Sequence, residues 1–143
     1  MAEFKLVLST KDGKSYQREV KEKDARPFLG KKIGDAVKGD DFGLAGYEVQ
    51  ITGGSDWCGF PMRADAPGTA RRRVLAVHGV GIHKKAKGVR QRKTVCGNTI
   101  HGKIAQINLK VMKEGKEILG KADEKHEEKA EKGEAKKPEE KKK

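Results

Sequence analysis

The chain has 143 residues, 38% of them charged, and a mean hydropathy of −0.83, which suits one small domain with a modest core. Its formal net charge is +12 and its pI is about 9.7. No apolar run approaches the roughly 20 residues of a membrane-spanning helix, and the first residues lack the features of a signal peptide. We therefore expect a cytoplasmic protein with no membrane partner, whose two cysteines, Cys58 and Cys96, are free thiols.

Short alternations of apolar and polar residues, separated by glycines, predict a mainly β chain. The expected strands cover residues 4–9, 15–20, 47–51, 74–77 and 104–113. Asp12-Gly13 supplies a hairpin turn, Gly53-Gly54 ends the third strand, and Glu114-Gly115 turns the last strand back towards residues 118–119. Because no segment before residue 120 keeps a 3.6-residue period, we expect one domain over residues 1–120, a small β-barrel of short strands with glycine-rich turns.

The composition changes at residue 121 to lysine, glutamate and alanine, with no apolar residue larger than alanine. Like charges recur four residues apart and Gly133 and Pro138 interrupt the segment, so a helix here would be marginal in water. We expect residues 121–143 to form a charged tail that is disordered when free and can order against a partner.

The whole net charge lies in residues 66–113, the basic block, which has twelve lysines and arginines and no acidic residue. Residues 1–65 hold 11 bases and 11 acids, and residues 114–143 hold 10 of each. Folding does not need such a single-sign field, because like charges repel, and its usual partner is nucleic acid. The expected RNA contacts are Arg71, Arg72, Arg73, Lys84, Lys85, Lys87, Arg90, Arg92, Lys93 and Lys103.

All seven aromatic residues precede residue 61, so the basic block contains none. Proteins that bind single-stranded RNA stack bases on aromatic rings, which this block cannot do. Arginine and lysine without rings suit phosphate contacts on a structured, double-helical RNA. The alternative interpretation of the block is a solvated charged face.

A second concentrated feature is the sequence Gly53-Gly54-Ser55-Asp56, followed by Gly59-Phe60-Pro61-Met62. The two adjacent glycines permit a positive φ or a close backbone approach, and Ser55 and Asp56 can bond neighbouring amides. The segment is therefore interpreted either as a structural turn of the barrel or as a loop that approaches an RNA backbone.

No catalytic or metal site is legible. Residues 97–103 have the spacing of a phosphate-binding P-loop, but Ile104 replaces the serine or threonine that holds magnesium, and a strand pattern follows instead of a helix. Cys58 and Cys96 lack the C-x-x-C pairing or close histidine that zinc sites use. The sequence predicts no metal, no cofactor, no small-molecule substrate and no enzymatic activity.

Four motifs, GGSD-x-x-GFPM, RRRVL, KGVRQRKTV-x-GN and IAQINLKV, together resemble the eukaryotic-type small-subunit ribosomal protein six family. The resemblance covers about residues 4–120, with the motifs in family order. It implies a β-barrel protein bound to small-subunit ribosomal RNA as a structural constituent. It also implies a signature loop and a set of RNA contacts. The signature loop comprises Gly53, Gly54, Ser55, Asp56, Gly59, Phe60, Pro61 and Met62, and the RNA contacts are Arg71 to Arg73, Arg90, Arg92 and Lys93.

Two departures from the family pattern matter. Cys96 stands where the family has arginine, which removes one expected RNA contact. No serine follows Ser55, so the resemblance is to the short archaeal form, without the phosphorylated C-terminal helix of eukaryotic members.

The sequence thus predicts a structural constituent of the small ribosomal subunit that binds folded ribosomal RNA through the basic block. Its expected partners are small-subunit ribosomal RNA and neighbouring small-subunit proteins, and its expected location is the cytoplasmic ribosome. The alternative is an RNA-binding accessory factor that visits the ribosome during assembly or translation.

Overall fold

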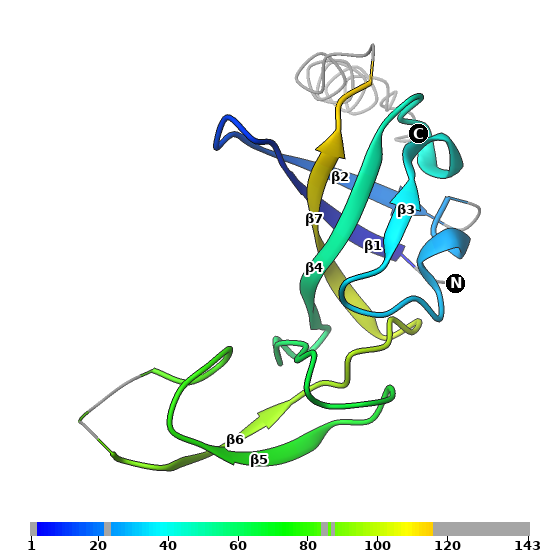
Figure 1. The fold of residues 1–143 in the computed structure, drawn as a ribbon. Helices are drawn as coiled ribbons and strands as arrows, with labels where there is room; N and C mark the ends of the chain where they lie inside the picture. Colours follow the sequence, from blue (N-terminus) through cyan, green and yellow to red (C-terminus); the bar gives the residue numbers. More distant parts are fainter. Residues whose placement is uncertain (1–2, 22–23, 84–85, 87, 116–143) are drawn as a thin grey trace, which may run out of the picture.

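The computed structural model describes residues 3–21, 24–83, 86 and 88–115, and these residues form a mainly β fold. Five strands make one sheet in the order β2-β1-β7-β4-β3, and β5 and β6 make a separate hairpin (Figure 1). The sheet strands are β1 (Glu3–Ser9), β2 (Ser15–Lys21), β3 (Ala36–Lys38), β4 (Glu48–Asp56) and β7 (Ile104–Lys113). The remaining elements are β5 (Arg72–Ala76), β6 (Gln91–Val95) and two short 3-10 helices, η1 (Arg26–Phe28) and η2 (Gly39–Phe42).

The core lies on one face of the five-stranded sheet. Phe4, Leu6 and Leu8 of β1 are buried, whereas the residues between them are more exposed. This pattern follows from the pleat, because successive side chains of a strand point to opposite faces of the sheet. Ile107 and Leu109 extend the same buried face on β7, which pairs parallel with β1 and antiparallel with β4. The sheet is therefore half-buried, as its alternating sequence predicts.

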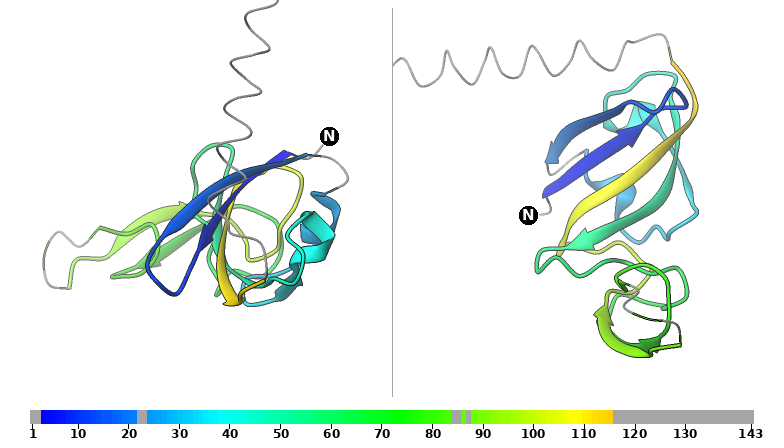
Figure 2. Two further views of the ribbon diagram at one scale, coloured as in Figure 1. Left: turned by 90° about the horizontal axis from the view of Figure 1, so that it is seen from above. Right: turned by 90° about the vertical axis from the view of Figure 1, so that its left-hand side faces the viewer.

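The closed barrel expected from the sequence is not confirmed. Among the described residues, β2 pairs only with β1 and β3 pairs only with β4, so the sheet stays open at both edges. The buried face is covered instead by the segment between β2 and β4, seen in two directions in Figure 2. Phe28 of η1 and Phe42 of η2 pack there with their ring centroids 5.2 Å apart. Because this segment covers the core, the outer strands need not meet.

The expected end of the third strand at Gly53-Gly54 is wrong, because β4 continues through both glycines to Asp56. Neither glycine has a positive φ. A side chain at Gly54 would overlap the carbonyl oxygen of Gln106 on the neighbouring β7. At Gly53, by contrast, a Cβ would meet no atom within 4 Å. The close packing of β4 on β7 therefore explains why residue 54 is glycine, but it does not explain Gly53.

Strands β5 and β6 form an antiparallel hairpin that projects away from the five-stranded sheet (Figures 1 and 2). We call residues 71–95 the arm. The sequence predicted a strand over residues 74–77 but an extended loop over 84–93, the last part of which is β6. The predicted tail, residues 121–143, and the return segment at 118–119 lie outside the described residues.

Two segments, residues 61–68 and 96–99, lie between the arm and the sheet in the chain and are hydrogen-bonded to each other; we call them the neck. The Cys96 N–H donates to the Pro61 carbonyl at 2.9 Å, and the Asn98 N–H donates to the Ala66 carbonyl at 2.8 Å. The Asn98 side-chain amide bonds the same segment, because its oxygen accepts from the Gly68 N–H at 3.2 Å. The two segments of the neck are thus bonded to each other at more than one point. Within the described part of the chain, no helix has the length and apolar character needed to cross a membrane.

Candidate nucleic-acid interface

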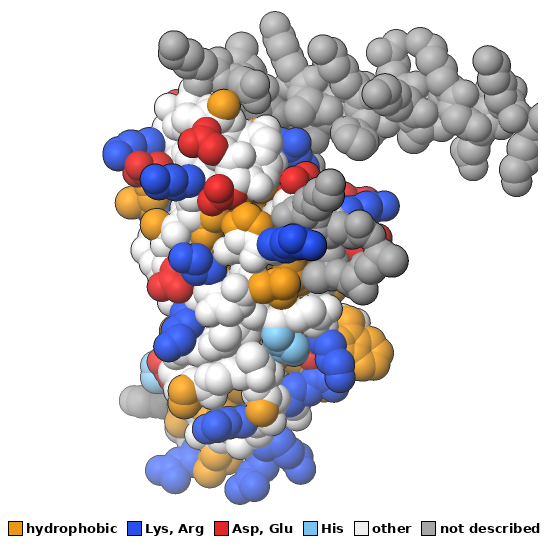
Figure 3. Space-filling view, turned by 90° about the vertical axis from the view of Figure 1, so that its right-hand side faces the viewer, with side chains coloured by type: hydrophobic (Ala, Val, Ile, Leu, Met, Phe, Trp, Pro, Cys, Tyr) orange, Lys and Arg blue, Asp and Glu red, His pale blue; other side chains and the backbone are white. Residues whose placement is uncertain are grey.

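The arm presents the basic block as an exposed two-stranded ribbon. Its described basic residues, all exposed, are Arg71, Arg72, Arg73, Arg90, Arg92 and Lys93. The register places Arg73 opposite Thr94, Leu75 opposite Arg92 and Val74 opposite Lys93. Paired residues share a face and successive residues alternate, so both faces of the ribbon are basic. In the space-filling view of Figure 3, lysine and arginine side chains gather at the lowest part of the molecule.

The other four predicted RNA contacts are not among the described residues of the arm. Lys103 is exposed and directly precedes β7, so it lies at the base of the sheet and not on the arm. Lys84, Lys85 and Lys87 fall outside the described residues. Of the described basic residues on the arm, only Arg71 forms an ion pair with a described acidic residue.

Arg71 differs from its two neighbours because it bonds a buried carboxylate. Asp56, at the end of β4, is only 2% exposed, and its Oδ2 accepts a hydrogen bond from Arg71 Nε at 2.6 Å. Asp56 Oδ1 accepts from the Trp57 backbone N–H, also at 2.6 Å. The bond to Asp56 raises the pKa of the Arg71 guanidinium above its ordinary value, although the side chain stays about one third exposed. The buried carboxylate thus has a charged partner, as buried charges require.

Two aromatic rings lie against the same guanidinium. Arg71 Cζ is 5.3 Å from the ring centroid of Trp57 and 5.2 Å from that of Phe60, both within the range of cation–π contact. Trp57 is nevertheless 66% exposed. Trp57 lies outside the basic block, so the absence of aromatic residues from that block does not exclude base stacking beside the arm. Fourteen residues separate Trp57 from Arg71 in the chain, and only the fold brings them together.

The signature loop doubles back along the end of β4. The Asp56 N–H donates to the Phe60 carbonyl at 2.9 Å, and the Met62 N–H donates to the Gly54 carbonyl at 2.9 Å. Gly59 makes the turn with a φ of +80°, a conformation that favours glycine. Met62 is buried in the core.

Two further members of the loop, Ser55 and Pro61, form a β-bridge across the turn. The signature loop therefore forms a turn that positions Asp56 for Arg71.

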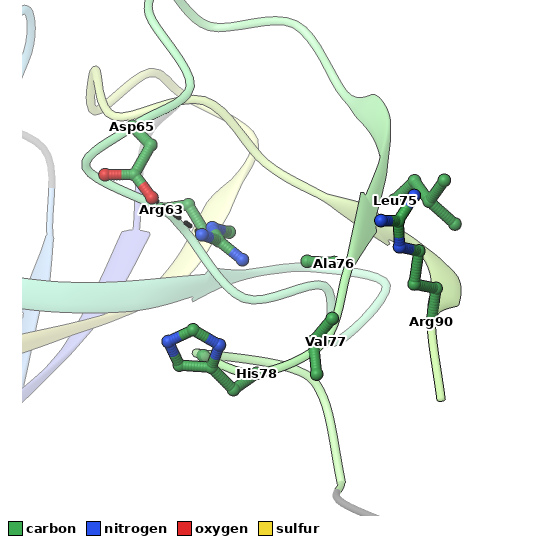
Figure 4. Close-up of a pocket in the computed structure, with 8 residues that line it drawn as sticks. Arg63, Asp65, Leu75, Ala76, Val77, His78 and Arg90 are labelled. Carbon is green, nitrogen blue, oxygen red and sulfur yellow. Dashed lines mark hydrogen bonds and ion pairs between the residues drawn. The ribbon is translucent and has the colours of Figure 1, made fainter. Parts of the chain in front are cut away.

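An open concavity of about 730 Å³ lies between the neck and the arm (Figure 4). Its lining residues are Arg63, Asp65, Leu75, Ala76, Val77, His78, Gly79 and Arg90. Arg63 Nη2 donates to Asp65 Oδ2 at 2.6 Å, so an acidic residue from outside the basic block partly offsets the positive charge here. The sequence analysis did not select Arg63, which lies just before the acid-free segment.

The cysteines occupy contrasting positions. Cys96 is buried in the neck, and its Sγ lies 3.8 Å from the Thr69 carbonyl oxygen. Burial raises the pKa of this thiol, and the nearby Asp56 carboxylate raises it further. Cys58 is exposed, and both thiols are free. The part of the chain that the structure describes contains no group of three or more His, Cys, Asp or Glu side chains placed to hold a metal ion.

Comparison with known proteins finds that this sequence is similar to ribosomal proteins. Residues 4–123 match the family of ribosomal protein S6e. The small ribosomal subunit protein eS6 of Archaeoglobus fulgidus is 50% identical over 116 residues, which cover 80% of this chain and 90% of that protein. The proteins of the same name from Methanoculleus marisnigri and Methanococcus maripaludis are 46% and 48% identical, over 83% and 82% of this chain and 91% and 93% of their own lengths.

The chain therefore belongs to the ribosomal protein S6e family. This confirms the family resemblance drawn from the four motifs. It also confirms the predicted role, since the family consists of structural ribosomal proteins and not of enzymes.

Proposed function

We propose that this structural constituent of the small ribosomal subunit binds folded small-subunit ribosomal RNA through its arm. Residues 1–120 act as the RNA-binding domain, and the chain works on the ribosome beside neighbouring small-subunit proteins. The related archaeal proteins carry the name of the small ribosomal subunit, which supports this placement.

The observation that carries the proposal is that the exposed ribbon of β5 and β6 bears positive charges and no acidic side chain. Arg72, Arg73, Arg92 and Lys93 are exposed on β5 and β6, and none of them pairs with a described carboxylate. A two-stranded ribbon with guanidinium and ammonium groups on both faces can contact phosphates on two sides. Each phosphate that it neutralises releases condensed counterions, and this release favours binding.

The five-stranded sheet supplies rigidity and not charge. An isolated two-stranded hairpin is marginally stable in water, and repulsion among its bases weakens it further. Neck hydrogen bonds, such as that from the Met62 N–H to the Gly54 carbonyl of β4 at 2.9 Å, hold the arm on the sheet. The spacing of the phosphate contacts is then set before the RNA binds.

Charge reversal on the arm and on the sheet tests this division. We expect Arg72→Glu/Arg73→Glu to abolish binding of the full chain to small-subunit ribosomal RNA, with an unchanged Tm. The matched control, Lys11→Glu/Lys14→Glu, reverses two exposed charges at the turn between β1 and β2 and should keep most of the affinity. Equal losses in both variants would show that binding follows net charge and not the arm.

A further inference from the structure

We propose that Trp57 is a stacking platform for an unpaired nucleobase of the RNA that the arm binds, an inference that rests on the proposed function. At 66% exposure, Trp57 has the largest exposed fraction of the large hydrophobic residues in the described chain. Tryptophan is enriched at interfaces, because its ring supplies a large apolar contact area and its indole N–H a hydrogen-bond donor.

The indole is held in place before any ligand arrives. Arg71 covers part of the ring at 5.3 Å, and its own position is set by the bond to buried Asp56. The Trp57 backbone is fixed as well, because its N–H lies 2.6 Å from Asp56 Oδ1 and 3.1 Å from the Lys103 carbonyl oxygen. With the guanidinium on the ring and two thirds of the residue open, a flat group can stack without reordering the loop.

The open side of Trp57 borders a shallow concavity of about 450 Å³. The other lining residues are Glu3, Gly102, Lys103, Ile104 and Ala105. Exposed Lys103 stands at its edge, where an ammonium group can meet the phosphate of the nucleotide that carries the stacked base.

The surrounding charges favour a nucleobase over an apolar protein surface. Two cations, Arg71 and Lys103, lie beside the indole. The one acidic lining residue, Glu3, is ion-paired with Lys21 at 4.0 Å. None of the other lining residues is an exposed large apolar side chain. Base stacking on aromatic rings tolerates any base, and an adjacent arginine adds a cation–π contribution. Phosphate contacts on the arm and one stacked base at its root are therefore complementary.

Two short RNA duplexes test the inference. Both duplexes contain one unpaired nucleotide, an adenosine in the first and an abasic residue in the second, so that only the base differs. We expect Trp57→Ala to weaken binding of the full chain to the adenosine duplex by roughly fivefold to a hundredfold. Trp57→Phe, which keeps a ring, should lose less. For the wild type, removing the base should cost about as much affinity as Trp57→Ala does, and the variant should bind both duplexes equally.

Fluorescence gives an independent readout, because Trp57 is the only tryptophan in the chain. Its emission should be quenched by the adenosine duplex and not by the abasic one. Met112→Ala, which truncates another exposed apolar side chain on the sheet, is the matched control and should change neither affinity nor quenching.

The outcomes separate the two proposals. If the arm reversal Arg72→Glu/Arg73→Glu abolishes binding but Trp57→Ala and the abasic residue have no effect, the stacking inference is wrong while the proposed function stands. Trp57 would then be assigned to a protein neighbour. If the wild-type chain binds neither duplex nor small-subunit ribosomal RNA, both proposals are wrong.

Discussion

The five-stranded sheet and the arm are built on opposite physical principles. In the sheet, apolar side chains alternate with polar ones, and strands from both ends of the chain bury a common face. In the arm, exposed arginine and lysine side chains occupy both faces of two strands. Among the described residues of the arm, Val95, beside the neck, has the one fully buried apolar side chain. Hydrophobic burial stabilises the first region, whereas in the second each described basic residue except Arg71 lacks a described acidic partner.

The signature loop connects these two regions, and Asp56 is central to it. It ends β4 of the sheet and bonds Arg71, the first residue of the arm. We therefore expect stability and RNA binding to depend on different residues, and we expect Arg71, which bonds the buried Asp56, to contribute to stability. Variants can test where that boundary lies.

The largest expected effect comes from the close contact between β4 and β7. Gly54→Val should destabilise the fold by about 3 kcal/mol or more, because its side chain would overlap the Gln106 carbonyl on β7. Gly53→Val is the matched control and should cost less than about 1 kcal/mol, since open space surrounds that position. Urea unfolding of the two variants measures the difference. Similar losses at both glycines would contradict the packing found here.

A smaller effect is expected at the junction. Arg71→Ala should lower the Tm more than Arg72→Ala does, because it leaves the buried Asp56 carboxylate without its charged partner. In an Asp56→Asn background the same substitution should have a weaker effect, since no buried charge is then left unpaired. If Arg71→Ala reduces RNA affinity without lowering the Tm, Arg71 is an RNA contact, as the sequence alone predicted.

The smallest effect is expected from the tail. Deleting residues 121–143 should leave the Tm unchanged and the RNA affinity within about twofold, because residues 114–143 are net neutral and the tail has no apolar residue larger than alanine. A loss of binding as large as that of the arm reversal would move the interface to the tail. The arm would then not be the main RNA-binding surface of the protein.

Local patterns predicted the sheet well and the arm poorly. The expected strand over residues 104–113 coincides with β7, and the turn at Asp12-Gly13 joins β1 to β2, because apolar alternation marks a half-buried strand. Strand β6 was missed because Gln91–Val95 is mostly polar and basic and has no alternation to detect. Barrel closure depends on whether β2 and β3 meet, which no local pattern determines.

The basic residues of the candidate interface could be named from the sequence, because a block without acids is visible as composition. The different role of Arg71 could not, since it depends on a carboxylate fifteen residues earlier that the fold buries. Trp57 was missed for the same reason. Both residues became recognisable only when the signature loop placed them side by side.

The salt dependence of RNA binding tests the central claim most directly. Suppose that roughly six to eight lysine and arginine side chains on and near the arm contact phosphates. A plot of log Kobs against log salt concentration, for the full chain binding small-subunit ribosomal RNA, should then have a slope of about −5 to −7. The Lys11→Glu/Lys14→Glu control should keep that slope. A wild-type slope flatter than about −2 would contradict the account, because too few phosphates would then be neutralised for the arm to be the binding surface.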